Sequence, residues 1–149
     1  MKIKKETMRK KVLLFLWQLP QNVIGFLLTK LFRCVELYLN DEENDIRYFI
    51  ATRFNKKWSG VSLGNYIIIA KMKYATETTI KHEHGHQIQS QKLGLLYLLV
   101  IGLPSFFGNI YDRFAHWNWS RTKRLKWYYN QPWEKSADKL GKVNRVFSL

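Results

Sequence analysis

The segment HEHGH at residues 82–86 is the part of this chain best suited to chemistry. A helix turns by about 100° per residue, so His82 and His86 present their imidazoles on one face, where they can hold one metal ion. His84 points to another side of that helix. In H-E-x-x-H sites the glutamate acts as general base toward the water that zinc activates. The segment therefore predicts one Zn²⁺ ion bound by His82 and His86, with Glu83 as the catalytic base.

A catalytic zinc ion needs a third protein ligand, and few residues after the motif qualify. The remaining carboxylates and histidine are Asp112, His116, Glu134 and Asp138. A third histidine directly after the motif is excluded, because Gln89 and Lys92 occupy those positions. Glu134 and Asp138 share one helical face, so we expect Glu134 to bind zinc while Asp138 accepts the N–H of a ligand histidine. The alternative is a solvated helix face paired with neighbouring lysines.

HEHGH on one helix and WEKSAD on a later one, with its E-x-x-x-D spacing, resemble the glutamate-ligated zincin metallopeptidases, the gluzincins, here in a small, membrane-associated bacterial form. The resemblance implies zinc ligation by His82, His86 and Glu134. It also implies that Glu83 is the general base and that Asp138 supports a histidine. An edge strand beside the motif helix would hold the substrate backbone, and we expect it at residues 65–72. The N-terminal third matches no zincin segment.

The residue that stabilises the developing oxyanion carries no motif of its own. Tyr128, Tyr129, His116 and Arg121 each have a side chain that can donate a hydrogen bond to such an oxygen. Gln89 lies seven positions after the first ligand on the same helical face, where it would support a ligand or cap the pocket.

The sequence patterns of the elements that position these residues predict a small α+β domain with a short antiparallel sheet. Residues 34–39 and 46–54 alternate or are rich in β-branched and aromatic residues, and the polar DEEND segment between them predicts a hairpin. Residues 61–72 predict a further strand, with Gly64 as a bulge or a point of close approach.

Two helices should carry the candidate metal ligands. The motif helix is expected to start with Thr76 or Thr78 as its N-cap and to stop at Gly94. The ligand helix should start near residue 131, with a proline in its first turn, and end at Gly141. We expect residues 1–149 to form one zincin-like domain.

Composition limits the classes of protein to which the chain can belong. A chain of 149 residues is about one domain long, and its hydrophobic fraction of 46% excludes a disordered tail. Cys34 is the only cysteine, which excludes a disulfide framework, a cysteine-based zinc knuckle and a cysteine-ligated deaminase site. The net charge of +14 predicts a polyanionic partner, either an anionic membrane surface or nucleic acid.

Two uncharged runs, residues 12–29 and 93–111, favour the membrane as that partner. The first follows a basic segment and lacks a cleavage site, so residues 1–32 are expected to be a retained membrane-associating segment. Pro20, Gly102 and Pro104 interrupt the runs. If residues 93–111 crossed the bilayer, the motif and Glu134 would lie on opposite sides, so we expect a re-entrant, interfacial or core segment.

Together these features predict a zinc metallopeptidase that hydrolyses peptides or proteins at a membrane surface, on the cytoplasmic side. A non-catalytic, zinc-stabilised interaction protein is the alternative from another class, and Glu83 argues against it because a structural site has no use for a base. A nucleic-acid-binding protein ranks lower, although Trp and Tyr interleave with Lys and Arg at 117–129. The sequence does not define the oligomeric state.

Overall fold

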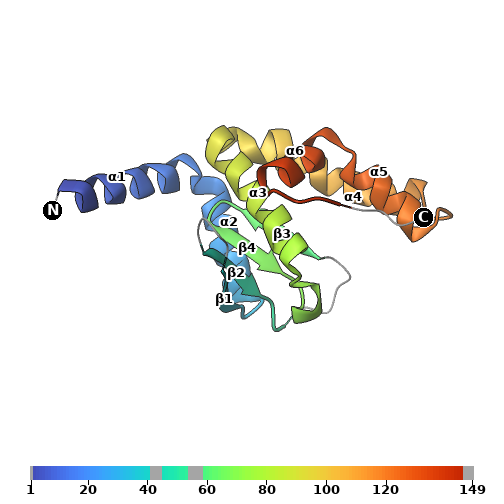
Figure 1. Cartoon of the computed structure of the whole chain (residues 1–149), viewed down its shortest axis with the longest axis horizontal. Coiled ribbons are helices and arrows are strands. Elements are labelled where there is room, and N and C mark those ends of the chain that lie inside the picture. The colour runs from blue at the N-terminus through green and yellow to red at the C-terminus, as the bar shows by residue number, and fades with distance from the viewer. Residues whose placement is uncertain (1, 41–44, 54–58, 146–149) are drawn as a thin grey trace.

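The computed structural model describes residues 2–40, 45–53 and 59–145, and it has a small α+β fold (Figure 1). Its helices are α1 (Lys2–Trp17), α2 (Leu19–Leu31), α3 (Glu77–Leu93), α4 (Leu103–Ala115), α5 (Arg121–Tyr129) and α6 (Pro132–Leu140), with 3₁₀ turns η1 (Met72–Tyr74) and η2 (Gly94–Leu96) and a π-helical turn η3 (Leu98–Gly102). Its strands are β1 (Val35–Leu39), β2 (Ile46–Ile50), β3 (Gly60–Leu63) and β4 (Tyr66–Ile69).

The four strands form a mixed sheet in the order β1-β2-β4-β3. The predicted hairpin is confirmed as β1 and β2, whose DEEND connection lies mostly outside the described residues. The expectation of an antiparallel sheet is wrong for one pair, because β2 and β4 are parallel. After β2 the chain moves to the far edge as β3 and returns as β4 between β3 and β2, so the two inner strands run the same way.

The segment expected to form one strand at 61–72 is instead a second hairpin. Leu63 pairs with Tyr66, so Gly64 and Asn65 form a two-residue turn, and Gly64 has φ +61°. A side chain at Gly64 would also collide with the Asn22 side chain of α2. Gly-Asn between apolar segments is a hairpin signal, and the turn explains the glycine better than a bulge does.

Both faces of the sheet are covered. Ile67 and Ile69 pack with Ile80 of α3 on one face, whereas Ile68 packs with residues of α2 on the other. This alternation follows from the period of two in a strand and places α3 directly against β3 and β4. Figure 1 shows α1 extending from this body at one end and α4 and α5 at the other.

The predicted ends of the two ligand-bearing helices are confirmed. Thr76 caps α3 by accepting a hydrogen bond from the backbone N–H of Thr79 at 3.2 Å, and Gly94 follows the last residue of that helix with φ +55°. Helix α6 starts at Pro132 and is followed by Gly141.

Both apolar runs are bent. Helices α1 and α2 are bent by 88° relative to each other. The helical segment of α3 and η2 is bent by 120° relative to the segment of η3 and α4. Among the described residues no single helix has the length and apolar composition to cross a membrane, whereas these two bent pairs pass that test together. Pro20 sits in the first turn of α2, where a missing N–H costs nothing, and Pro104 is the second residue of α4, which follows directly on the π-helical turn η3. Within 93–111 most apolar side chains are exposed, so this segment is not the core of the fold.

Candidate metal centre

Helices α3 and α6 bring His82, His86 and Glu134 into one buried group. The Nε2 atoms of His82 and His86 lie 3.1 and 3.3 Å from the same oxygen, Glu134 Oε2. The three candidate ligand atoms all lie within 4.8 Å of one another, and Glu134 is fully buried. The chain reverses direction within residues 93–111, so the residues before and after this run lie together. The group of three can hold a metal ion.

Each histidine is oriented by a hydrogen bond at its other nitrogen. His82 Nδ1 lies 2.7 Å from Asp138 Oδ1, and His86 Nδ1 lies 2.7 Å from Gln89 Oε1. The Gln89 amide nitrogen donates to the carbonyl of Trp133 at 2.9 Å, which fixes the amide so that its oxygen faces His86. Both imidazoles therefore carry the proton on Nδ1 and direct Nε2 toward Glu134, as a metal-binding histidine requires.

Two of the three separations between the candidate ligand atoms fit a tetrahedral ion. Two ligands about 2.0–2.1 Å from zinc and a tetrahedral angle apart are separated by about 3.3 Å. The two measured Nε2-to-oxygen distances, 3.1 and 3.3 Å, agree with that separation. The donor set of two imidazoles and one carboxylate also matches a known class of catalytic zinc site.

The electrostatics of the group favour a cation. Burial alone would raise the pKa of Glu134, but hydrogen bonds with His82 and His86 hold it far below its ordinary value. Burial likewise opposes the charged form of His82, whereas hydrogen bonds with Asp138 and Glu134 raise its pKa to about 9. The carboxylates thus stay ionised and attract positive charge, which a bound divalent cation would supply in place of a proton.

Glu134 and Asp138 are each held by a second partner that the sequence did not reveal. Ser105 of α4 donates its hydroxyl to Glu134 Oε1 at 2.5 Å and lies 3.0 Å from the hydroxyl of Tyr128. Arg145 donates from Nε to Asp138 Oδ2 at 2.7 Å. Ser105 lies 29 residues before Glu134, whereas Arg145 lies only seven after Asp138, and neither Ser105 nor Arg145 belongs to a motif.

Glu83 is buried between α3 and the start of β3. A side chain at Gly60 would come within 2.7 Å of Glu83 Oε1, so the glycine lets the strand approach the carboxylate without displacing it. Burial raises the pKa of Glu83, while the neighbouring His82 and His86 lower it. A carboxylate with a raised pKa, close to the candidate ligands, has the properties of a general base.

The edge strand beside the motif helix is β3, not the predicted segment 65–72. That segment contains β4, which lies inside the sheet between β3 and β2. In the β3–β4 register, the backbone groups of Gly60 and Ser62 point away from β4. The Ser62 carbonyl accepts a hydrogen bond from the buried Tyr97 hydroxyl at 3.1 Å. The groups of Gly60 face the outer edge of the sheet, close to Glu83.

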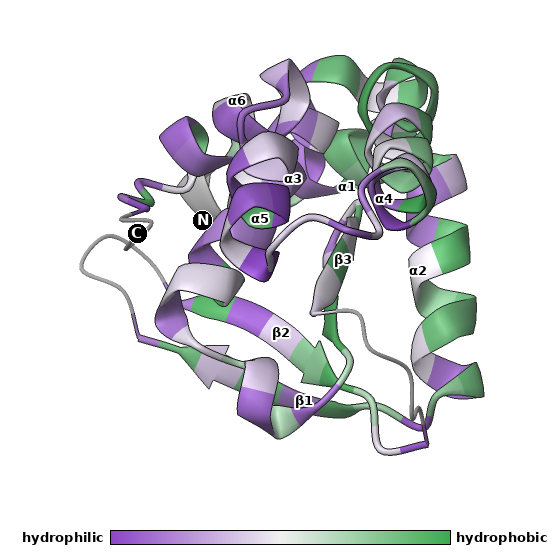
Figure 2. Cartoon of the chain, turned by 90° about the vertical axis from the view of Figure 1, so that its right-hand side faces the viewer, coloured by the Kyte–Doolittle hydropathy of each residue, from purple (hydrophilic) through white to green (hydrophobic). Residues whose placement is uncertain are grey.

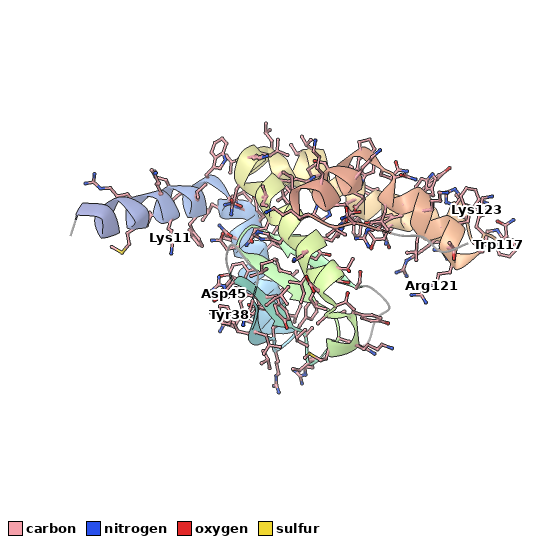
Figure 3. All side chains as sticks on the ribbon, viewed as in Figure 1. Lys11, Tyr38, Asp45, Trp117, Arg121 and Lys123 are labelled. Carbon is pink, nitrogen blue, oxygen red and sulfur yellow. The ribbon has the colours of Figure 1, made fainter. Side chains whose placement is uncertain are left out.

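The four candidates for oxyanion stabilisation separate into two pairs. Tyr129 packs edge-on against His82 with ring centroids 5.2 Å apart, and Tyr128 is hydrogen-bonded within the Ser105–Glu134 group. His116 instead stacks on a tryptophan and bonds with Asp112. Arg121 is exposed at the end of the molecule formed by α4 and α5 (Figure 3). The structure thus brings the two tyrosines to the candidate ligands and leaves the other pair away from them.

Close packing of α6 on α3 depends on Gly85 inside the motif. A side chain here would lie 1.9 Å from the backbone oxygen of Ala137, so any larger residue would push the two helices apart. Gly141 makes the reciprocal approach, because a side chain there would lie 2.0 Å from the backbone oxygen of Lys81. The two glycines together let Glu134 reach the two histidines.

We expect Gly85→Ala to lower stability by about 1–3 kcal/mol, although Ala normally favours a helix over Gly. The shift of α6 should also weaken zinc binding, because Glu134 moves with it. Gly108→Ala is the matched control: the new side chain would lie 3.5 Å from Trp133, an ordinary contact, so stability should stay equal or rise slightly. Thermal unfolding and zinc titration of both variants measure the difference. Equal stability in the two variants would contradict this account of Gly85.

No protein-family model, curated protein or solved structure matches this chain.

Proposed function

We propose that this chain is a zinc-dependent peptidase of the gluzincin type. The observation that carries the proposal is the convergence of His82, His86 and Glu134 on one point, with Glu83 buried beside them against a strand edge. The ordered hydrogen bonds at both Nδ1 atoms support the same interpretation, since they leave both Nε2 atoms for a metal.

The donor set favours a catalytic site over a structural one. Structural zinc sites are closed by four protein ligands, whereas catalytic sites use three and keep a position open for water or substrate. Within the described residues the candidate group has three members. Bound zinc would supply Lewis-acid polarisation of a substrate carbonyl and lower the pKa of a water molecule.

The residues around the metal ligands would carry out the remaining steps. Glu83 would take the proton of the attacking water and pass it to the leaving amine nitrogen. The outward backbone groups of Gly60 on β3 would bind an extended peptide by strand addition, which places its carbonyl near Glu83. Tyr129, which packs against His82, is our choice as hydrogen-bond donor to the oxyanion. This use of a strand edge favours a polypeptide as substrate.

The experiment that tests this function is cleavage of a diverse peptide mixture by the purified full-length chain, followed by mass spectrometry. We expect cleavage with one bound zinc per chain, its loss on treatment with a chelator, and its return when zinc is restored. A chain that binds zinc, unfolds when the metal is removed and cleaves no peptide would instead be the non-catalytic, zinc-stabilised protein.

A further inference from the structure

Helices α1, α2 and α4 and the turns before α4 expose an unusual number of large apolar side chains. On α2 these are Leu19, Val23, Ile24, Phe26, Leu27 and Leu31. From η2 to the end of α4 they are Leu95, Leu96, Leu99, Val100, Leu103, Phe106, Phe107, Tyr111 and Phe114. We call these two sets together the apolar face. Exposed apolar side chains in this number, on neighbouring elements, indicate an interaction site.

Helix α2 is turned with its polar side inward. Gln21 and Asn22, together with Gln18 at the start of the helix, are fully buried. The Gln21 amide donates to the carbonyl of Gly94, and the Asn22 side-chain oxygen accepts from the backbone N–H of Asn65. These bonds hold α2 in this rotation, so its apolar side must face outward. A helix on a water-exposed surface has the opposite arrangement.

The two parts of the apolar face lie on the same side of the molecule. Figure 2 shows α2 and α4 along one side with much hydrophobic colour, whereas α5 and α6 are mainly hydrophilic. Helix α1, whose residues from Val12 to Trp17 are exposed and apolar, joins α2 at its start. Helices α1 and α2 also contact η2, so the exposed apolar side chains of these distant segments lie on neighbouring elements.

Basic residues lie at both ends of this surface. Lys11 on α1 lies at one end of the molecule, and Arg121 and Lys123 lie at the opposite end (Figure 3). The single acidic residue between 94 and 130, Asp112, is buried and paired with Arg124 at 2.7 Å. Exposed Trp117 lies at the same end as Arg121 and Lys123, and exposed Trp17 lies at the junction of α1 and α2. An apolar surface with basic ends and exposed tryptophans complements the acyl and headgroup layers of an anionic bilayer.

We propose that the apolar face inserts into one leaflet of an anionic bilayer without crossing it. The 88° bend turns the first apolar run through a right angle, and the 120° bend turns the second back on itself, so neither forms a straight span and both can lie in the interface. The occupant of the surface is therefore lipid with anionic headgroups. Nucleic acid would satisfy the basic ends but would leave the apolar face uncovered.

This orientation bears on the substrate of the proposed peptidase, and that consequence rests on the proposed function. Ser105, which bonds with Glu134, precedes the exposed Phe106 and Phe107 on α4. One helix therefore contacts both the candidate metal ligands and the proposed membrane. A site held in this way would act on polypeptide segments that lie at the bilayer surface.

Vesicle flotation of the full-length chain tests the insertion. We expect wild-type protein to float with phosphatidylcholine–phosphatidylglycerol vesicles more strongly than with phosphatidylcholine alone. Once bound, it should stay bound in about 1 M NaCl, where charges are screened beyond about 3 Å. Complete release by salt would show surface attraction without insertion and would overturn the proposal.

The apolar contribution is tested by Phe106→Gln with Phe107→Gln, which should lower vesicle binding by roughly tenfold or more. Tyr38→Gln with Met72→Gln is the matched control, because these side chains are 58% and 65% exposed on the sheet side, against 60% and 59% for the phenylalanines. The control should bind as wild type. Equal binding by both double variants contradicts the proposal. Binding to oligonucleotides without binding to vesicles would also contradict it. The same holds if the protein forms a stable dimer that does not bind vesicles and that the phenylalanine substitutions convert to monomer.

Two measurements separate this proposal from the proposed enzymatic function. The Phe106/Phe107 double variant should keep its zinc and its cleavage of soluble peptides, because both side chains are largely exposed and neither is a candidate ligand. Glu83→Gln should float as wild type does. A chain that floats but cleaves nothing refutes the peptidase alone, whereas a chain that cleaves but never floats refutes the insertion alone.

Discussion

Glu83→Gln is expected to lower peptide cleavage by about 10²–10⁴-fold while the protein still binds one zinc ion. Glutamine has almost the shape of glutamate, so the packing against Gly60 of β3 should persist. The amide cannot accept a proton from the attacking water, and only the proton-transfer step is removed. Cleavage rates and metal content, measured on the same protein preparation, test both halves of the expectation.

The matched control for this variant is Glu77→Gln on the same helix. Glu77 lies in the first turn of α3, exposed, and pairs with Lys81 at 2.9 Å, so its substitution should change neither cleavage nor zinc content. Loss of zinc in Glu83→Gln would show that Glu83 is itself a ligand. Full activity in Glu83→Gln would exclude it as the base and would remove the main argument against a purely structural metal site.

Glu134→Ala is expected to weaken zinc binding by more than the 10–100-fold loss that follows removal of a residue supporting a ligand. The substitution removes the oxygen toward which both histidine Nε2 atoms point, at 3.1 and 3.3 Å. It also leaves the Ser105 hydroxyl without its acceptor. Competition with a chromophoric chelator measures the affinity, and circular dichroism shows whether the fold remains.

Two further variants make this expectation specific. Glu134→Gln keeps the size of the buried side chain but removes its charge, so it should also bind zinc weakly while remaining folded. Asp138→Asn keeps an oxygen that can accept the His82 N–H, and its loss of affinity should be about tenfold, near the lower end of the range for a supporting residue. Unchanged zinc affinity in both Glu134 variants would show that the third ligand is another residue.

Much of the candidate site could be predicted because its signals are local. His82 and His86 share a helical face by virtue of their spacing alone, and the spacing of Glu134 and Asp138 does the same on the later helix. The scarcity of carboxylates after the motif left few candidates for the third ligand. Thr76, Gly94 and Pro132 marked the helix ends because capping depends on a few adjacent residues.

Other features depended on contacts that no local pattern encodes. The turn at Gly64 and Asn65 split one expected strand into two and moved the edge of the sheet from 65–72 to β3. The supporting contacts of Ser105 and Arg145 come from segments distant from the motif. His116 and Arg121 had suitable chemistry, but the fold directs them elsewhere.

The sequence by itself determined which residues could bind a metal and which helices carry them, because imidazole and carboxylate chemistry and helical periodicity are properties of the chain. Only the tertiary structure decided that these helices meet. That meeting depends on the reversal between α3 and α4 and on Gly85 and Gly141, which let two backbones approach closely. The tertiary structure also decided that the apolar runs are exposed, because α2 buries its polar side and its apolar side therefore faces outward.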